Sequence, residues 1–266
     1  ISNESFESIT SKVHGFVKHD LESKILNVFK EYYGRTEEEI ASTFNVATNA
    51  KNRFSVYVSR MFNVSNLENS EEFQKASFVL KTIRINKNGS IKEKMSFPQM
   101  DFIDVAYTPW EESSVRMYFA ESRFLFLIFK ETDRGYVFEQ AYFYNFTDNI
   151  IDDFIGYTYK KTQQILLDGN IVKNVGTQVV KNENKLIHST NFVGSKENMI
   201  CHVRPHARDF NDSKPLPVVD KVTGYTEYEK QCFWIDTRFI SAVLENKLNE
   251  YLKEAYKKLN KQSSDD

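Results

Sequence analysis

The first sixty residues carry apolar side chains at helical spacing. The positions that recur every three or four residues after Asp20 are Leu21, Ile25, Val28 and Tyr32. They predict a helix that Asp20 caps and Gly34 ends. Thr36 and Glu39 have the spacing of a capping box for a second helix, and a third is predicted over about 51–62. The basic residues of this segment fit a helix-turn-helix, but one helical wall of a larger domain is the commoner arrangement.

Short apolar runs bounded by turn residues predict a strand-rich middle. These runs are Phe78–Ile85, Arg123–Lys130, Tyr136–Phe146, Met199–Arg204 and Gln231–Asp236. Each has the length and the apolar content of a strand. The sequence Asp133-Arg134-Gly135 predicts a hairpin between the second and third runs, and Asn88-Gly89 predicts a turn after the first. A helix is predicted from Asp148 to Leu167, closed by Gly169.

The remaining segments complete an α/β pattern. The polar, Asn- and Lys-rich stretch 170–198 predicts a surface excursion, and 205–230 predicts a loop. One long amphipathic helix is predicted at the end, and its apolar face holds Ile240, Val243, Leu244, Leu248, Tyr251, Leu252 and Ala255. We expect a single domain over 1–266 made of two lobes. Its parts are a helical region over about 1–65, a mixed-sheet core over 66–245 and a C-terminal helix over 236–260.

Composition narrows the class of protein. The chain has 266 residues, of which 41% are hydrophobic and 14% aromatic, enough for a substantial core. The net charge of −2 argues against a globally basic nucleic-acid binder, so any DNA site must be a local patch. Two cysteines, Cys201 and Cys232, and the absence of a membrane-length apolar run predict a cytoplasmic protein without a membrane partner. Because the chain begins at Ile1 rather than Met, we expect a fragment of a longer protein.

The run Phe78–Ile83 has the pattern of a nuclease active-site strand that lacks its acid. Val79 and Lys81 should lie on one face, where a metal-dependent nuclease places an acid and a lysine. Val79 has no oxygen for a hard cation, and Glu72 alone is a poor Mg²⁺ site. Taken alone, the pattern is more typical of an ordinary strand with a solvated Lys81.

A second candidate segment runs from a strand into a loop. Arg204, His206 and Arg208 project from it, and Pro205 should stiffen the turn. Arginine can bind guanine through two hydrogen bonds, so the loop fits base recognition. A surface loop with ordinary ion pairs to the nearby aspartates fits the same residues slightly better.

The third candidate segment is Phe233–Phe239. Trp234 could pack on a base, and Arg238 could hold a phosphate, although a tryptophan among apolar neighbours is usually core. Zinc ligand types occur at Cys201, His202, His206 and Cys232. Adjacent strand residues face opposite sides and the paired spacing of a zinc site is absent, so no metal site is predicted.

Taken in order, these segments resemble the MutH family of GATC-specific DNA endonucleases. The family's acid-Leu-Lys-Thr strand matches Val79-Leu80-Lys81-Thr82 except at the acid, and a basic position before an apolar strand matches Arg123. The recognition loop matches Val203-Arg204-Pro205-His206, and the last aromatic strand matches Phe233-Trp234-Ile235. The match covers roughly residues 50–245. Ser122–Phe126 and Ile200–His206 look most like the C-terminal half of two-module, GATC-cutting type II restriction endonucleases.

The resemblance implies a restriction-endonuclease-like, MutH-type mixed sheet with flanking helices and two lobes around a DNA cleft. It implies that this domain binds double-stranded GATC DNA as an allosteric effector of the N-terminal catalytic module of the same protein. Mg²⁺ would serve the parent enzyme, and this domain would need no cofactor. The implied DNA-binding residues are Arg204, Pro205, His206, Arg208, Trp234 and Arg238. The implied remnants of a catalytic centre are Glu72, Val79, Lys81 and Arg123.

Two other functions remain open from the sequence. A residual Mg²⁺-dependent endonuclease at GATC would use Glu72 with a nearby acid such as Glu93 or Asp101. A protein-interaction module without DNA would fit the slightly negative net charge.

Overall fold

The computed structural model describes residues 7–9, 20–50, 52–92, 94–180, 183–209 and 211–263. The chain divides into two compact units. Unit 1 comprises residues 1–93 and 121–145, and unit 2 comprises residues 94–120 and 146–266. The α/β class with mixed sheet pairing and flanking helices is confirmed.

Unit 1 contains a three-stranded sheet in the order β1-β3-β4. Its strands are β1 (Phe78–Ile85), β3 (Arg123–Thr132) and β4 (Gly135–Tyr144). β1 runs parallel to β3 and begins with Phe78 opposite Arg123, whereas β3 and β4 are antiparallel. The turn between β3 and β4 brings Gly135 to φ +96°, a conformation that glycine adopts without steric cost. The apolar runs and turn residues therefore predicted these three strands correctly.

Within the described residues, four helices precede β1: α1 (Leu21–Lys30), α2 (Glu37–Phe44), α3 (Arg53–Met61) and α4 (Glu71–Lys75). The capping box at α2 is confirmed, because Thr36 Oγ1 accepts from Glu39 N at 3.1 Å and Glu39 Oε2 accepts from Thr36 N at 2.7 Å. The predicted cap of α1 is wrong. Asp20 has φ −120° and ψ −1° and makes no side-chain capping bond. Its backbone is not in the extended conformation that points an N-cap side chain at the first turn.

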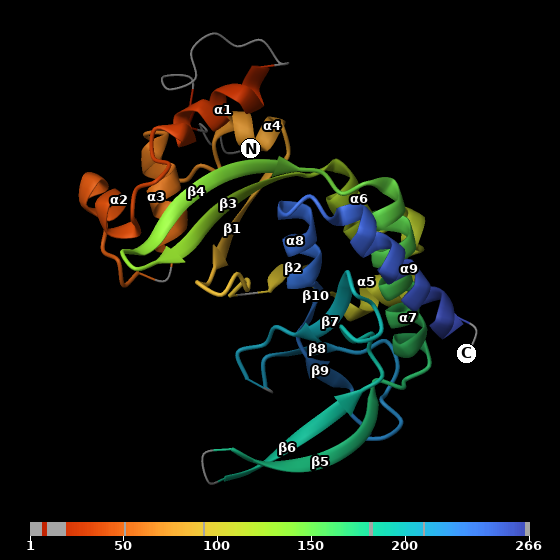
Figure 1. Cartoon of the computed structure of the whole chain (residues 1–266). Coiled ribbons are helices and arrows are strands. Elements are labelled where there is room, and N and C mark those ends of the chain that lie inside the picture. Colours follow the sequence, from red (N-terminus) through yellow and green to blue (C-terminus); the bar gives the residue numbers. More distant parts are fainter. Residues whose placement is uncertain are drawn as a thin grey trace, which may run out of the picture. The chain divides into compact units, whose positions relative to one another are not determined.

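The core of unit 1 lies between one face of its sheet and the helices α1–α3, which Figure 1 shows in red and orange beside β3 and β4. From β3, Leu125, Leu127 and Phe129 enter this core with no exposed surface. α3 contributes Phe54 and Tyr57 to it. Each fully buried side chain of this size contributes about 1.5–3 kcal/mol. The helical segment is therefore a wall of unit 1, as the simpler interpretation had it.

Unit 2 contains an antiparallel sheet in the order β2-β10-β7. Its strands are β2 (Met95–Gln99), β7 (Cys201–Pro205) and β10 (Gln231–Ile235). The π-helical turn η3 (Ile150–Ile155) leads into α7 (Gly156–Leu167), which packs on this sheet. Tyr159 stacks on Phe233 with ring centroids 6.1 Å apart, and Thr158 donates to the carbonyl of Cys201 at 2.9 Å. The short helices α5 (Phe102–Tyr107), η2 (Trp110–Glu112) and α6 (Ser114–Glu121) follow β2.

Two hairpins occupy the segments expected to be irregular. Within the expected excursion, β5 (Val172–Val180) pairs with β6 (Glu183–Thr190), and this hairpin is the long ribbon labelled in Figure 1. Within the expected loop 205–230, β8 (Ser213–Pro215) pairs with β9 (Glu227–Glu229). A two-stranded ribbon is held by backbone hydrogen bonds and can leave both faces in water. Polar sequences can therefore form it without the apolar alternation that marks a half-buried strand.

The prediction of a single long C-terminal helix is wrong. The structure has two helices, α8 (Thr237–Leu244) and α9 (Leu248–Ser263). Asn246 between them adopts the left-handed conformation at φ +57°. Asn246 N donates to Val243 O, and Lys247 N donates to Ala242 O at 2.8 Å, which is the bond pattern of a Schellman motif. None of the helices in the described ranges is both long enough and apolar enough to cross a lipid bilayer.

Candidate nucleic-acid interface

The strand that carries the nuclease-like pattern Val79-Leu80-Lys81-Thr82 is the edge strand β1 of unit 1. Val79 and Lys81 are both half-buried and pair in register with Phe124 and Phe126 of β3. The two residues share the sheet face opposite the helices, because strand side chains alternate. The structure thus brings Val79 and Lys81 to one face.

Glu72 lies on α4 and is only 6% exposed. Its carboxylate accepts hydrogen bonds from Ser8 Oγ at 2.5 Å and from Ile9 N at 3.0 Å. These bonds fasten the described N-terminal residues to unit 1. Glu72 therefore has a structural role that the sequence did not reveal.

Arg123 is separated from Val79 and Lys81. It faces the helix side of the sheet, since it lies opposite Phe78 and two positions before Leu125. Its Nη2 donates to Glu22 Oε2 of α1 at 2.7 Å, and its Nε donates to the other oxygen. The register of β1 on β3 thus directs Arg123 to an ion pair on the other face of the sheet.

Val79 and Glu72 are not arranged to hold a divalent cation. Val79 offers no oxygen, and the oxygens of Glu72 already accept two hydrogen bonds. Of the other acids considered, Glu93 lies outside the described residues. Asp101 belongs to unit 2, where it caps α5 and lies 3.3 Å from Lys214. Among the residues that the structure describes, no group of three His, Cys, Asp or Glu side chains is placed to hold a metal ion.

The second candidate group gathers on the sheet of unit 2. Arg204 is exposed, and its guanidinium lies 6.0 Å from the centre of the Trp234 ring. Trp234 is half-buried and donates from Nε1 to the carbonyl oxygen of Arg204 at 3.2 Å. The His206 ring lies 5.4 Å from the Trp234 ring, and Pro205 ends β7 between the two basic residues. Three of the predicted DNA-binding side chains therefore form one cluster on the face that α7 does not cover.

The remaining two arginines have carboxylate partners. Arg208 is exposed and donates to Asp209 at 3.1 Å. Arg238 donates to the two oxygens of Asp236 at 2.8 and 3.1 Å, and to the carbonyl oxygen of Ser195 at 2.9 Å. Arg204, in contrast, has no ion pair with any carboxylate in the described ranges. Its positive charge is therefore open to an anionic or hydrogen-bonding ligand.

The sequence did not predict a buried network of His202, Lys94 and Asp236 beside this cluster. His202, directly opposite Trp234 on β7, is 1% exposed. Lys94 immediately precedes β2, and its Nζ lies 3.5 Å from His202 Nε2 and 3.9 Å from Asp236 Oδ2. Because His202 and Arg204 are two residues apart on one strand, the sequence could have predicted that they share a face. Nothing in the spacing of the sequence pointed to Lys94.

Burial sets the protonation of the network. Burial, followed by the positive charge of Lys94, lowers the pKa of His202 from 6.5 to about 4. The imidazole is therefore neutral near pH 7. An ammonium group can only donate, so Nε2 facing Lys94 is the acceptor and Nδ1 carries the proton. This Nδ1–H is buried and has no hydrogen-bond partner among the described residues.

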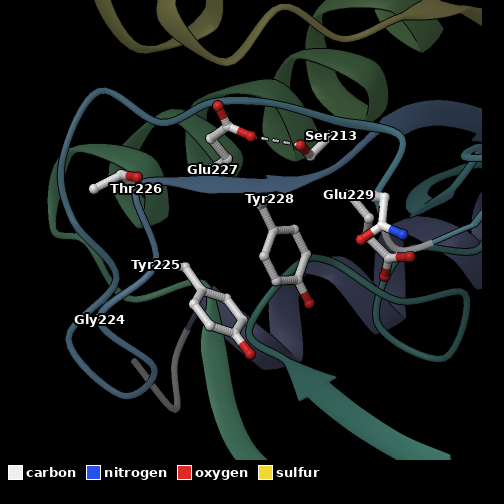
Figure 2. A pocket seen from close by; sticks show the side chains of 8 residues that line it. Ser213, Gly224, Tyr225, Thr226, Glu227, Tyr228 and Glu229 are labelled. Atoms are coloured by element: carbon white, nitrogen blue, oxygen red, sulfur yellow. Dashed lines mark hydrogen bonds between the residues drawn. The ribbon is translucent and has the colours of Figure 1, made fainter.

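A different hollow, on the β8–β9 hairpin, is unsuited to DNA. It has a volume of about 390 Å³ and is lined in part by Glu227, Glu229 and Tyr225. Figure 2 shows the Glu227 carboxylate hydrogen-bonded to Ser213, with the rings of Tyr225 and Tyr228 nearby. Burial raises the pKa of Glu229. A concave surface lined by carboxylates repels phosphate, so we place the candidate interface at Arg204 and not here.

No protein-family model matches the chain. The chain is similar to "Type II restriction enzyme Sau3AI" of Staphylococcus aureus, with 25% identity over 275 residues. The match covers 93% of this chain and 56% of the relative, so the chain spans about half the length of the curated relative that it matches. The mixed α/β fold with flanking helices is compatible with a restriction-endonuclease-like fold. Almost the whole of this chain is thus similar to part of a type II restriction enzyme.

Proposed function

We propose that this chain is a DNA-binding domain of a type II restriction endonuclease, which recognises GATC in duplex DNA without cutting it. In this proposal its DNA-bound form activates a catalytic module elsewhere in the same protein. The observation that carries the proposal is the Arg204 guanidinium, exposed beside Trp234 and without a carboxylate partner among the described residues. The similarity to a type II restriction enzyme supports the same conclusion.

The geometry of Arg204 fits base recognition. Its peptide carbonyl is held by Trp234 Nε1, which fixes the backbone from which the guanidinium projects. A guanidinium can donate two parallel hydrogen bonds to O6 and N7 of guanine. The adjacent Trp234 and His206 rings offer apolar and polar surfaces to neighbouring bases. One good bidentate contact discriminates against a wrong base by about 1–3 kcal/mol.

The residues of unit 1 support the proposal that this chain does not cut DNA. Hydrolysis by a metal-dependent nuclease needs carboxylates that hold the cation, together with a lysine. In this chain Val79 stands where the nuclease strand has its acid, and the Glu72 carboxylate binds Ser8 and Ile9. We propose that Mg²⁺ acts only in the catalytic module of the parent enzyme. Activation requires that DNA bound here favours one arrangement of the two modules over another.

Fluorescence anisotropy with a GATC duplex and a scrambled duplex tests the recognition. We expect tighter binding to GATC, and we expect Arg204→Ala to weaken that binding by about 5- to 150-fold while leaving scrambled DNA nearly unaffected. Lys160→Ala is the control, because it removes an equal charge that Glu111 already pairs, on the helix that covers the other face of the sheet. Absence of binding to either duplex would favour a protein-interaction module instead.

Two further assays test the catalytic part of the proposal. Supercoiled GATC plasmid should stay supercoiled with excess chain and Mg²⁺, whereas linear product would revive a residual endonuclease. In the full-length parent enzyme, Arg204→Ala should slow cleavage while the catalytic module keeps its own residues. Unchanged cleavage by that variant would contradict the effector role.

A further inference from the structure

We propose that Lys94 binds a DNA phosphate, and that His202 and Asp236 hold it in place as a phosphodiester subsite beside Arg204. The inference rests on the proposed function, since the ligand is the backbone of the DNA that Arg204 is proposed to read. It adds a residue to the interface that lies outside the recognition loop in sequence and adjoins it in the folded unit.

The first argument is the charge of this face. Lys94, Arg204 and Arg238 are three cations; Asp236 is the carboxylate nearest to Lys94, and Glu254 also acts electrostatically on Arg238. His202 is neutral near pH 7. The cations of this face therefore outnumber these two carboxylates by one, although the whole chain has a net charge of −2. A local excess of this kind attracts a polyanion.

The second argument is that Asp236 is already occupied. Its carboxylate accepts from Arg238 N at 3.0 Å, from Nε at 2.8 Å and from Nη2 at 3.1 Å. Lys94 Nζ lies 3.9 Å from the nearer oxygen, which is beyond hydrogen-bond distance. Asp236 thus draws Lys94 toward the face without using its donors.

The third argument is that the ammonium of Lys94 can accept a ligand. Its one hydrogen bond in the described residues is the long contact of 3.5 Å to His202 Nε2, so further N–H donors are available. The side chain is 29% exposed, which leaves a path for a phosphate oxygen. Burial lowers the pKa of Lys94, and the positive charges of Arg204 and Arg238 act in the same direction against Asp236. A bound anion would stabilise the charged form of Lys94 against the burial and the two arginines.

The fourth argument assigns His202 a positioning role. The ring lies under the face at 1% exposure and accepts from Lys94 through Nε2. This contact limits the lysine to the side of β7 on which the Arg204 side chain also lies. A compact ammonium is a point charge suited to a phosphate oxygen, whereas base reading favours the planar fork of arginine. The geometry therefore assigns Lys94 to the backbone and leaves the bases to Arg204.

Salt dependence of DNA binding distinguishes these two roles. Anisotropy titrations between about 50 and 200 mM salt should give Lys94→Gln a slope smaller by about 0.9 on the GATC duplex and on the scrambled duplex, with equal loss of affinity on both. Lys94→Arg should retain most of the slope. Lys214→Gln is the matched control, since Lys214 is 27% exposed and pairs with Asp101. It should keep the wild-type slope.

The outcomes separate the inference from the proposed function. An unchanged slope for Lys94→Gln, or a loss confined to the GATC duplex, would overturn the phosphate assignment. Equal binding of both duplexes by the wild type would refute GATC recognition, while the Lys94→Gln slope would still decide this inference. Absence of any DNA binding by the wild type would overturn both.

A second measurement uses the wild-type chain, in case Lys94→Gln fails to fold. Lysines are reductively methylated with and without saturating duplex, and each site is quantified by mass spectrometry. Lys94 should be protected several-fold by either duplex, whereas Lys214 should be labelled equally in both samples. Equal labelling of Lys94 would overturn the proposal.

Discussion

Acidification should destabilise unit 2 through His202. The pKa of His202 in the folded chain is about 4, and its ordinary value is 6.5. The unfolded chain therefore takes up a proton at a higher pH than the folded chain does. The stabilising contribution is fully present above about pH 6.5 and is lost as the pH falls toward 4. A shift of this size corresponds to about 3 kcal/mol in the free energy of unfolding, because one pKa unit is worth about 1.4 kcal/mol.

Tryptophan fluorescence reports this loss selectively. The chain has two tryptophans, Trp110 and Trp234, and both belong to unit 2. Guanidinium unfolding followed by this signal at several pH values between 4 and 7 reports the unfolding of unit 2. In the His202→Gln variant, most of the loss of about 3 kcal/mol should disappear, while titrating carboxylates common to both proteins cancel in the difference.

An exposed histidine on the same sheet face provides the control. His206→Gln should keep the wild-type pH dependence, because the His206 ring is exposed and outside the buried network. If wild type and His202→Gln lose stability in parallel from pH 7 to 4, the assignment of a buried neutral imidazole is wrong.

The other predictions concern separate parts of the chain. Thr36→Ala should lower the stability of unit 1 by about 1 kcal/mol, measured by circular dichroism, since it removes a capping box. Gly169→Ala should destabilise unit 2 by more than 1 kcal/mol in the fluorescence assay: φ is +57°, and a Cβ would lie 2.5 Å from Val219 O. Burial raises the pKa of Cys201 to about 12, so a thiol reagent should label it only after unfolding. Burial lowers the pKa of Lys94 below 10.5, so DNA binding by the wild type should weaken as the pH rises toward that value. Lys94→Arg should keep its affinity over the same pH range.

The sequence predicted the elements whose side chains have a clear period or a demanding turn. β1 was predicted because its apolar run is followed by the turn residues Asn88-Gly89. The β3–β4 hairpin was predicted because a glycine, Gly135, stands where the turn needs positive φ. The polar ribbons and the break at Asn246 were missed, since backbone hydrogen bonds and a left-handed asparagine leave little trace in hydropathy. These features depend on the backbone more than on the apolar pattern.

The candidate site was predictable only where it is local in sequence. Arg204 and His206 share one strand and loop, and their approach to Trp234 follows from pairing β7 with β10. The position of Lys94 depends on tertiary packing, because 108 residues separate it from His202. Arg123 illustrates the same limit, since only the register of β1 on β3 decides which face it occupies.

Under the proposed function, the contacts of Glu72 bear on how easily this chain could acquire a catalytic centre. A Val79→Glu substitution would place one carboxylate on β1 in a single step. The second carboxylate would have to give up the Ser8 hydroxyl and the Ile9 amide, leaving a buried N–H without an acceptor. Activity and stability would thus oppose each other along that path. Under the proposed function, an evolutionary return to cutting would therefore be opposed by selection for stability, because Glu72 already holds Ser8 and Ile9.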